Sequence, residues 1–270
     1  MTTEFIGISA MTAIAKYSAV YIPNLLQNNK LKPDSNGYYN TTMGAFNIVS
    51  RNGVYYPATN AVLNLFKPGG IVRRRLDEGV MRSELGHPNI VGLDVKSILR
   101  RLAVIEEKNV CAHIRDLELI KGRDDKGQEI IIVNGSFKPS GPYGTTFKEQ
   151  VDNPDENVAF SVRCFANQYI NKGLLNKEAK DIITYDTVND AGVKFASQFD
   201  YAKLATPTIG LESLCELSDI SFTDTDLHNA IKQPNSSVGL ESEFSRLTHV
   251  RTALGWQNIQ VVDLGAVAWQ

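Results

Sequence analysis

Three polar residues in this 270-residue chain have the side chains that nucleophilic catalysis requires. Ser161 lies in the apolar run VAFSVRCF, His87 stands between a glycine and a proline in SELGHPNI, and Asp186 interrupts the apolar run IITYDTV. A serine hydroxyl is a weak nucleophile at neutral pH, so it needs an adjacent base, usually a histidine that a third polar group orients. These residue types therefore indicate acyl transfer, provided that the fold brings them together.

Each of these residues also has an interpretation without chemistry. A serine on a strand commonly faces solvent or bonds to the backbone, and a histidine before proline is commonly a loop residue. Asp186 can close a turn through its side chain. Spacing alone does not choose between these interpretations and catalysis, so the elements that carry the three residues matter.

The stretches around the candidates predict mostly strands. NVAFSVRCFANQYI predicts a strand that carries Ser161, and KEAKDIITYDTVND ends in a strand that carries Asp186. Asn52-Gly53 predicts a hairpin turn between two short strands in GAFNIVSRNGVYYP. EIIIV predicts a further strand, TTFKEQV a short helix, and NNKLKPDSNGYYN a loop.

The remaining segments are less regular. Val95, Ile98, Leu99 and Leu102 have helical spacing, but the β-branched content of residues 95–119 also suits a strand hairpin, and the second half alternates as a strand does. Residues 1–30 form an apolar, weakly periodic lead-in. Residues 200–250 indicate an extended or loosely helical extension, and NIQVVDLGAVAW a last strand or a docking tail.

Composition indicates an ordinary globular protein. The chain is 43% hydrophobic and 21% charged, and it is long enough for one large domain or one domain with extensions. Lys and Arg (28) nearly balance Asp and Glu (30), and the net charge of −2 removes the electrostatic argument for a nucleic-acid partner. Glu4 and Lys16 do not suit a signal peptide, and no apolar run reaches membrane-span length. We expect a soluble protein made in cytoplasm, without a membrane partner.

The sequence predicts neither a cofactor nor a metal. Cys111, Cys164 and Cys215 are far apart and form no CxxC pair, so a disulfide framework and a zinc site are both unsupported, and a reducing compartment fits best. The four histidines lack ligand spacing. GxxxxGK[ST] and GxGxxG are both absent, which removes support for a nucleotide-dependent enzyme.

The order of four motifs resembles a known family. NGVYYP, SELGHP, the Ser-x-Arg of FSVRCF and TYDTV are similar to motifs of the prohead core serine proteases of tailed bacteriophages, which resemble the herpesvirus assemblins. The resemblance covers about Gly44 to Val193. It implies an α+β fold with a β-barrel-like core and surrounding helices, and strands for residues 95–119. We expect a protease domain in residues 1–199 and a C-terminal extension in residues 200–270.

The resemblance also implies roles for individual residues. His87 matches the family's base, Ser161 its nucleophile and Asp186 its third member, whereas assemblins use a second histidine, which makes His113 the alternative. His228 and His249 lie in the extension and are expected at the surface.

Supporting roles follow from position. On a strand Arg163 projects from the same face as Ser161, where it is a candidate for oxyanion support, with an ordinary salt bridge as the alternative. Glu84 is a candidate for orienting the histidine loop through backbone N–H groups. The chain departs from the family at Ser83, Val162 and Cys164, where the family has glycine, serine and glycine.

Substrates follow from the resemblance alone. Such enzymes digest scaffold and trim major capsid proteins inside the prohead in the host cytoplasm, cutting after glutamate. GLES occurs twice, so Glu212 and Glu241 are predicted self-cleavage sites, and Arg73–Arg75 and Arg82 are candidate cations for a glutamate pocket. Homo-oligomerisation and retention in the virion are left open. The competing prediction is an inactive protease-fold protein associated with capsid or scaffold.

Overall fold

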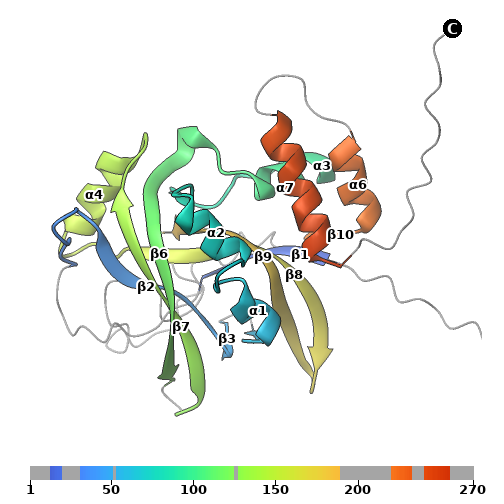
Figure 1. The fold of residues 1–270 in the computed structure, drawn as a ribbon, viewed down its shortest axis with the longest axis horizontal. Helices are drawn as coiled ribbons and strands as arrows, with labels where there is room; N and C mark the ends of the chain where they lie inside the picture. The colour runs from blue at the N-terminus through green and yellow to red at the C-terminus, as the bar shows by residue number, and fades with distance from the viewer. Residues whose placement is uncertain are drawn as a thin grey trace, which may run out of the picture.

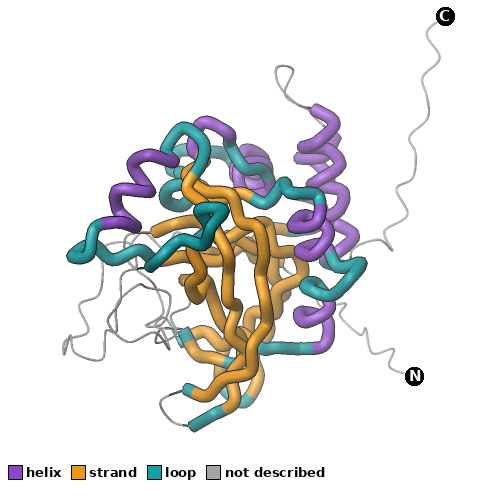
Figure 2. Tube along the Cα trace, turned by 60° about the vertical axis from the view of Figure 1, so that its left-hand side comes forward, coloured by secondary structure: helices purple, strands orange, loops and turns teal. Residues whose placement is uncertain are grey.

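The computed structural model describes residues 13–19, 31–50, 53–124, 127–188, 220–232 and 240–255, which form two β-sheets with helices around them (Figures 1 and 2). The larger sheet has the strand order β10 (Ile220–Phe222), β1 (Ala13–Ala19), β8 (Ala159–Asn171), β9 (Leu174–Val188), β4 (Val54–Tyr56) and β3 (Ile48–Val49). The smaller sheet has the order β2 (Tyr39–Phe46), β7 (Glu129–Pro139), β6 (Val110–Arg123) and β5 (Arg82–Glu84).

The predicted α+β class is confirmed, but the described strands do not close into a barrel. Both strand orders have free ends, and an isolated parallel bridge between Leu85 and Thr187 joins the end of β5 to β9. All neighbouring strands are antiparallel except β4 and β9. The barrel-like core is therefore not found in the described part of the chain, and kinship with the assemblins stays a prediction.

The main hydrophobic core lies between the two sheets. Phe137 of β7, Phe147 of α4 (Gly144–Asp152) and Phe160 of β8 are fully buried and contact one another, with ring centroids 5.1 to 6.2 Å apart. Burying an aromatic side chain of this kind contributes about 1.5–3 kcal/mol. This core fixes β8, and with it the position of Ser161.

Helices cover the other face of the larger sheet. A second core joins Phe165 of β8 and Ile183 of β9 to three helices, which lie together in Figure 1: α3 (Val95–Ala103), α6 (Asp224–Lys232) and α7 (Leu240–Ala253). Two shorter helices, α1 (Asn60–Asn64) and α2 (Ile71–Asp77), also pack against β9, but their buried residues Val62, Val72 and Leu76 belong to the main core. The molecule therefore has three layers, with the larger sheet in the middle.

The prediction of strands for residues 95–119 is wrong in its first half. Residues 95–103 form α3, which begins where the Asp94 carboxylate accepts the Ser97 N–H at 2.7 Å and which buries Ile98, Leu99 and Leu102. The helical spacing was the better guide, because a side-chain cap and a buried stripe both favour a helix. A 3-10 turn, η1 (Glu107–Asn109), then leads into β6, as the alternation from Val110 predicts.

Most other sequence-based elements are confirmed. The hairpin is seen as β3 paired with β4, with Ile48 opposite Tyr56, although residues 51–52 of its turn lie outside the described residues. The predicted strands in EIIIV, around Ser161 and around Asp186 are β7, β8 and β9, and TTFKEQV is α4. The segment 258–269, predicted as a last strand or docking tail, lies outside the described residues.

The predicted C-terminal extension contributes an edge strand to the larger sheet and two helices to the layer that covers it. β10 pairs with β1, and the extension's helices bury Leu227, Leu247 and Val250 against α3 and β9. The boundary at residue 199 itself lies outside the described residues and stays a prediction. None of the described helices is both long and apolar enough to cross a bilayer.

Candidate active site

Ser161 and Asp186 face each other across two paired strands. Ser161 of β8 lies directly opposite Asp186 of β9 in the antiparallel register. Side chains at such positions point to the same face, with Cβ atoms about 4.5–5.5 Å apart. Both side chains are fully buried, and the Ser161 hydroxyl has no hydrogen-bond partner among the described residues. The strand pairing alone thus brings two of the three candidates together.

Alternation along β8 sets the face on which the site lies. Phe160, Val162 and Cys164 belong to the core between the sheets, so Ser161 and Arg163 point to the opposite, helix-covered face. The register shifts after Arg163, where β9 carries an extra residue. Such a bulge changes which face the side chains of β9 point to beyond it. Ser161 and Arg163 lie before this shift, so they keep a common face.

The histidine loop is fixed to β9 by backbone bonds. After β5, Leu85 forms its bridge to Thr187, and the Gly86 N–H donates to the Thr187 carbonyl at 2.8 Å. Gly86 has φ +77°, a left-handed conformation that glycine adopts without strain, and Pro88 restricts the backbone of His87, the residue before it. The constrained setting of His87 therefore places its ring beside the Asp186 end of β9.

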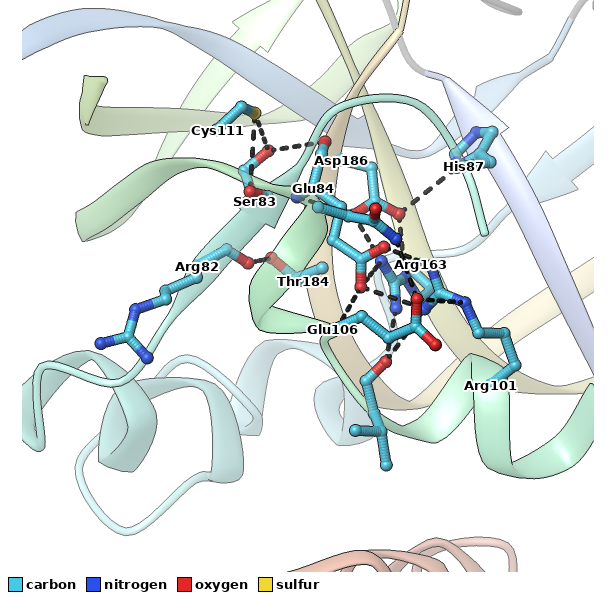
Figure 3. A network of polar contacts seen from close by, with 12 residues as sticks. Arg82, Ser83, Glu84, His87, Arg101, Glu106, Cys111, Arg163, Thr184 and Asp186 are labelled. Atoms are coloured by element: carbon cyan, nitrogen blue, oxygen red, sulfur yellow. Dashed lines mark hydrogen bonds and ion pairs between the residues drawn. The ribbon is translucent and has the colours of Figure 1, made fainter. Parts of the chain in front are cut away.

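His87 reaches the Asp186 carboxylate. Its Nδ1 lies 3.4 Å from Asp186 Oδ2, and 28% of the His87 side chain is exposed (Figure 3). An ionised carboxylate only accepts hydrogen bonds, so Nδ1 carries the proton in this contact and Nε2 is the atom left to accept one. Asp186 thus contacts His87 and lies opposite Ser161 in the strand register.

Asp186 is held ionised in spite of its burial. Burial would raise the pKa of Asp186, but the charge of Arg163 and the hydrogen bonds from His87 and Arg163 outweigh it, and the pKa lies below its ordinary value. Arg163 donates from Nε to Oδ2 at 2.8 Å and from Nη2 to Oδ1 at 2.7 Å. This bidentate pair is the strongest interaction of the carboxylate.

Arg163 is 1% exposed and lies at the centre of a buried ionic network (Figure 3). Besides Asp186 it donates to the Val104 carbonyl at 3.0 Å and lies 3.1 Å from Glu84 Oε1. Arg163 therefore forms salt bridges, the alternative to oxyanion support named above. Contact with an oxyanion stays a prediction.

Glu84 is buried at the end of β5. Its carboxylate accepts the Glu106 backbone N–H at 2.8 Å and bonds from both ends of the Arg101 guanidinium, while its own backbone N–H donates to Asp186 Oδ1 at 3.3 Å. The backbone N–H that Glu84 accepts belongs to the segment after α3, so the predicted bond to the histidine loop stays a prediction.

His113, the alternative third member, contacts other groups. Its Nδ1 lies 3.0 Å from the Tyr38 hydroxyl and its Nε2 lies 3.1 Å from the Gly79 carbonyl. It projects from β6 in the smaller sheet. Because both ring nitrogens have these partners, the geometry favours Asp186 as the neighbour of His87.

Sequence reasoning missed Arg101. Within α3, it is one of two adjacent arginines in the last turn, and its side chain is 11% exposed. A cation at a helix C-terminus is favourable for the dipole alone, so its type gave no functional signal. Arg101 contacts Glu84 only because the fold packs the end of α3 beside β5.

The predicted glutamate-pocket cations divide between two places. Arg73 pairs with Asp77 and Asp116, and Arg82 pairs with Glu107, all at 2.8 to 2.9 Å. Arg74 and Arg75 line a pocket of about 390 Å³ between α2, β9 and α7. Glu78, Arg246 and His249 also line this pocket, and the His249 side chain is 35% exposed, in keeping with the predicted surface position.

The carboxyl of Asp181, beside this pocket, gives a testable pH dependence. Burial raises the pKa of Asp181 to about 6, although Arg75 and Arg246 both donate to it. A carboxyl whose folded pKa exceeds its unfolded value binds protons preferentially in the folded state, so its charge costs stability as pH rises through 6. Relative to Asp181→Asn, wild type should gain about 1 kcal/mol between pH 7 and pH 5. Urea unfolding of both proteins at the two pH values measures this difference, and a constant difference contradicts it.

The described residues contain no group of histidine, cysteine or acidic side chains that could hold a metal ion. Cys111 and Cys164 are buried, and burial raises the pKa of each thiol to about 12. Both are therefore neutral, and neither is a competing nucleophile.

Comparisons with known proteins show the family to which this chain belongs. The chain is 30% identical over 234 residues to the capsid maturation protease of Pseudomonas phage phiKZ. The aligned region covers 84% of this chain and 83% of that protein. It is also similar to the structure of the bacteriophage T4 capsid assembly protease, with a TM-score of 0.44 and 12% identity over 65% of this chain and 98% of that one. The resemblance to phage head proteases is confirmed. A profile of the peptidase S80 family matches residues 17–252, and the chain therefore belongs to the peptidase S80 family.

Proposed function

We propose that this peptidase is a serine endopeptidase of bacteriophage head maturation, with Ser161 as nucleophile and His87 as base. The observation that carries the proposal is the position of Asp186, which lies opposite Ser161 across β8 and β9 and contacts His87 at 3.4 Å. The phiKZ relative, named a capsid maturation protease, supports the role in the head.

These positions support the following chemistry. Ser161 Oγ attacks the scissile carbonyl, while His87 Nε2 takes the hydroxyl proton and then gives it to the leaving amine. Asp186 holds the Nδ1–H tautomer and stabilises the imidazolium between the two transfers. Water then hydrolyses the acyl-enzyme by the same route. Ser161 is fully buried, so substrate binding must open a path to its hydroxyl.

A fluorophosphonate tests the nucleophile directly, because it reacts with an activated serine and releases fluoride. Wild type should gain one adduct on the peptide that contains Ser161. His87→Ala should label much more slowly, since the base is lost. An adduct on another residue rejects this assignment.

The proposed substrates are scaffold and major capsid proteins inside the prohead, cut after glutamate. A peptide with glutamate before the scissile bond should be cleaved at least about tenfold faster than its glutamine counterpart, the discrimination that about 1.4 kcal/mol provides. Arg74 and Arg75 are the candidate partners of the carboxylate. Their replacement by methionine should reduce this preference; equal cleavage of both peptides by wild type contradicts the specificity.

Self-cleavage after Glu212 and Glu241 is the second part of the substrate proposal. Glu212 lies outside the described residues, whereas Glu241 lies in the first turn of α7, where cleavage requires that turn to unwind. A cut there also separates buried Leu247 and Val250 from the rest of the chain. Intact mass after prolonged incubation tests both sites, with Glu212→Gln and Glu241→Gln as separate controls. An unchanged mass of active protein contradicts self-processing.

An inactive, protease-fold capsid or scaffold protein remains the second candidate. Its specific support is the combination of a fully buried Ser161 and a strand that departs from the family at Val162 and Cys164. Incubation of scaffold protein with wild type and with Ser161→Ala separates the two candidates. Loss of scaffold with wild type alone supports the enzyme, and equal loss in both rejects it.

A further inference from the structure

Glu84 is a buried carboxylate with an unusual number of donors. It is 1% exposed and accepts from Arg101 through both oxygens and from the Glu106 backbone N–H at 2.8 Å, while Arg163 Nη2 lies 3.1 Å from Oε1. A buried carboxylate costs several kcal/mol of desolvation unless it is paired in this way. Its donors therefore hold it in one orientation.

Arg163 connects this carboxylate to the candidate triad. Its Nη2 is shared between Glu84 and Asp186, and its Nη1 donates to the Val104 carbonyl at the end of α3. A guanidinium is planar, so contacts at both Nη atoms and Nε fix its orientation. Charges then alternate along the chain of contacts Arg101, Glu84, Arg163, Asp186 and His87 (Figure 3).

We propose that Glu84 and Arg101 are positioning residues of the protease. They act through Arg163, which aims the Asp186 carboxylate at the imidazole and sets how strongly the protein favours the protonated ring. This inference rests on the proposed function, because it assigns to the network a task in the serine mechanism.

The charged groups that face Asp186 come from every described element packed around it. β8 supplies Arg163, β5 supplies Glu84, and the end of α3 supplies Arg101, whose Nε lies 3.6 Å from Glu106. Lys108 lies 3.3 Å from Glu106 at the exposed edge, and the Cys111 thiol of β6 is neutral. Removal of one buried charge from this set changes the field at His87 with a predictable sign.

Glu84→Gln removes a negative charge and keeps the shape of the side chain. The imidazolium becomes less favourable, so the acid limb of the kcat/KM–pH profile should move to lower pH by about 0.5 to 1 unit. Misaimed Asp186 also lowers kcat by about tenfold or more with KM little changed, since positioning acts in the transition state.

Arg101→Met makes the opposite change. It leaves Glu84 short of one cation, which favours the imidazolium and should move the acid limb to higher pH by a similar amount. Arg101→Lys keeps the charge and loses the two-point contact, so its acid limb should lie near that of wild type while kcat recovers in part.

Arg100→Met is the matched control. Arg100 is the neighbouring arginine of α3, but it donates to the Ala230 carbonyl of α6 at 3.0 Å. Its loss should lower the melting temperature without moving the acid limb. If Glu84→Gln does not fold, Arg101→Met and Arg101→Lys still test the sign, and an NMR titration of the His87 ring in the Ser161→Ala background measures its protonation without activity.

The outcomes separate this inference from the proposed function. Opposite limb shifts in Glu84→Gln and Arg101→Met establish positioning. The inference is overturned, and the serine mechanism left intact, in either of two cases. In one, the acid limbs of the kcat/KM–pH profiles of both variants stay where they are in wild type. In the other, activity falls only in proportion to the melting temperature. Full activity of Ser161→Ala overturns the proposed function itself, whatever the limbs do.

Discussion

Ser161→Ala is expected to lose about 10⁴- to 10⁶-fold in kcat while the protein becomes slightly more stable. The loss of activity follows from removal of the nucleophile, after which only binding and electrostatic contributions remain. The gain in stability follows from burial, because the hydroxyl is fully buried without a partner among the described residues. An unsatisfied buried polar group costs about 1–3 kcal/mol, so its removal should raise the free energy of unfolding by about 1 kcal/mol.

Ser50→Ala is the matched control for this prediction. Ser50 is also buried, but its hydroxyl accepts the Val54 N–H at 3.2 Å in the turn between β3 and β4. Its replacement should keep full activity and lower the free energy of unfolding by about 1 kcal/mol. Cleavage kinetics and urea unfolding of both variants test this pair. Ser161→Ala should lose activity and gain stability, whereas Ser50→Ala should keep activity and lose stability. If Ser161→Ala is less stable than wild type, the conclusion that the buried Ser161 hydroxyl lacks a hydrogen-bond partner is contradicted.

Such a pair of outcomes bears on how a protein keeps an active site. A residue that destabilises the fold and is nonetheless present is explained by its chemistry, since packing alone would favour alanine. The strained or unsatisfied group is expected where function and stability conflict. Ser161 is the clearest such group among the described side chains of β8.

Local sequence signals predicted most of the elements that carry the site. The alternation Phe160, Ser161, Val162, Arg163 has a period of two, which is the direct signature of a strand with one polar face. The same logic places Asp186 on its strand. Strand register could not be predicted, because it depends on bulges in β9 that no local pattern reveals.

The errors arose where tertiary contacts or an assumed fold replaced local evidence. Residues 95–103 have a capping aspartate and a helical apolar stripe, but the resemblance to a β-rich fold led to a strand prediction. Arg101 was missed for the opposite reason. The role that we propose for it depends on Glu84, seventeen positions earlier, and nothing in either residue's own neighbourhood indicates the contact.

Asp186→Asn is expected to reduce kcat about 10³- to 10⁴-fold and also to destabilise the protein strongly. The amide cannot hold the Nδ1–H tautomer of His87 as an ionised carboxylate does, which accounts for the catalytic loss. It also leaves Arg163 buried without its bidentate anion, and breaking a buried pair in this way costs about 3–5 kcal/mol.

The pH dependence of this loss has a definite sign. The pKa of Asp186 lies below its ordinary value, so the ionised carboxylate stabilises the fold above the unfolded pKa near 4, and that contribution is lost as pH falls through the folded pKa. Urea unfolding should therefore show the full difference between wild type and Asp186→Asn at pH 7 and a smaller difference at pH 3. A difference that does not change with pH contradicts the ionised pair.

The double variant Asp186→Asn, Arg163→Met separates stability from catalysis. Methionine removes the unpaired cation and fills a similar volume with apolar atoms, while Glu84 keeps Arg101 and the Glu106 N–H as donors. Removal of both charges leaves neither one buried without its partner, which is the main cost of the single variant, so the double variant should regain most of the stability that the single variant loses. It should regain no activity, because nothing restores an anion beside His87. Recovery of cleavage together with stability would show that Asp186 serves only the fold.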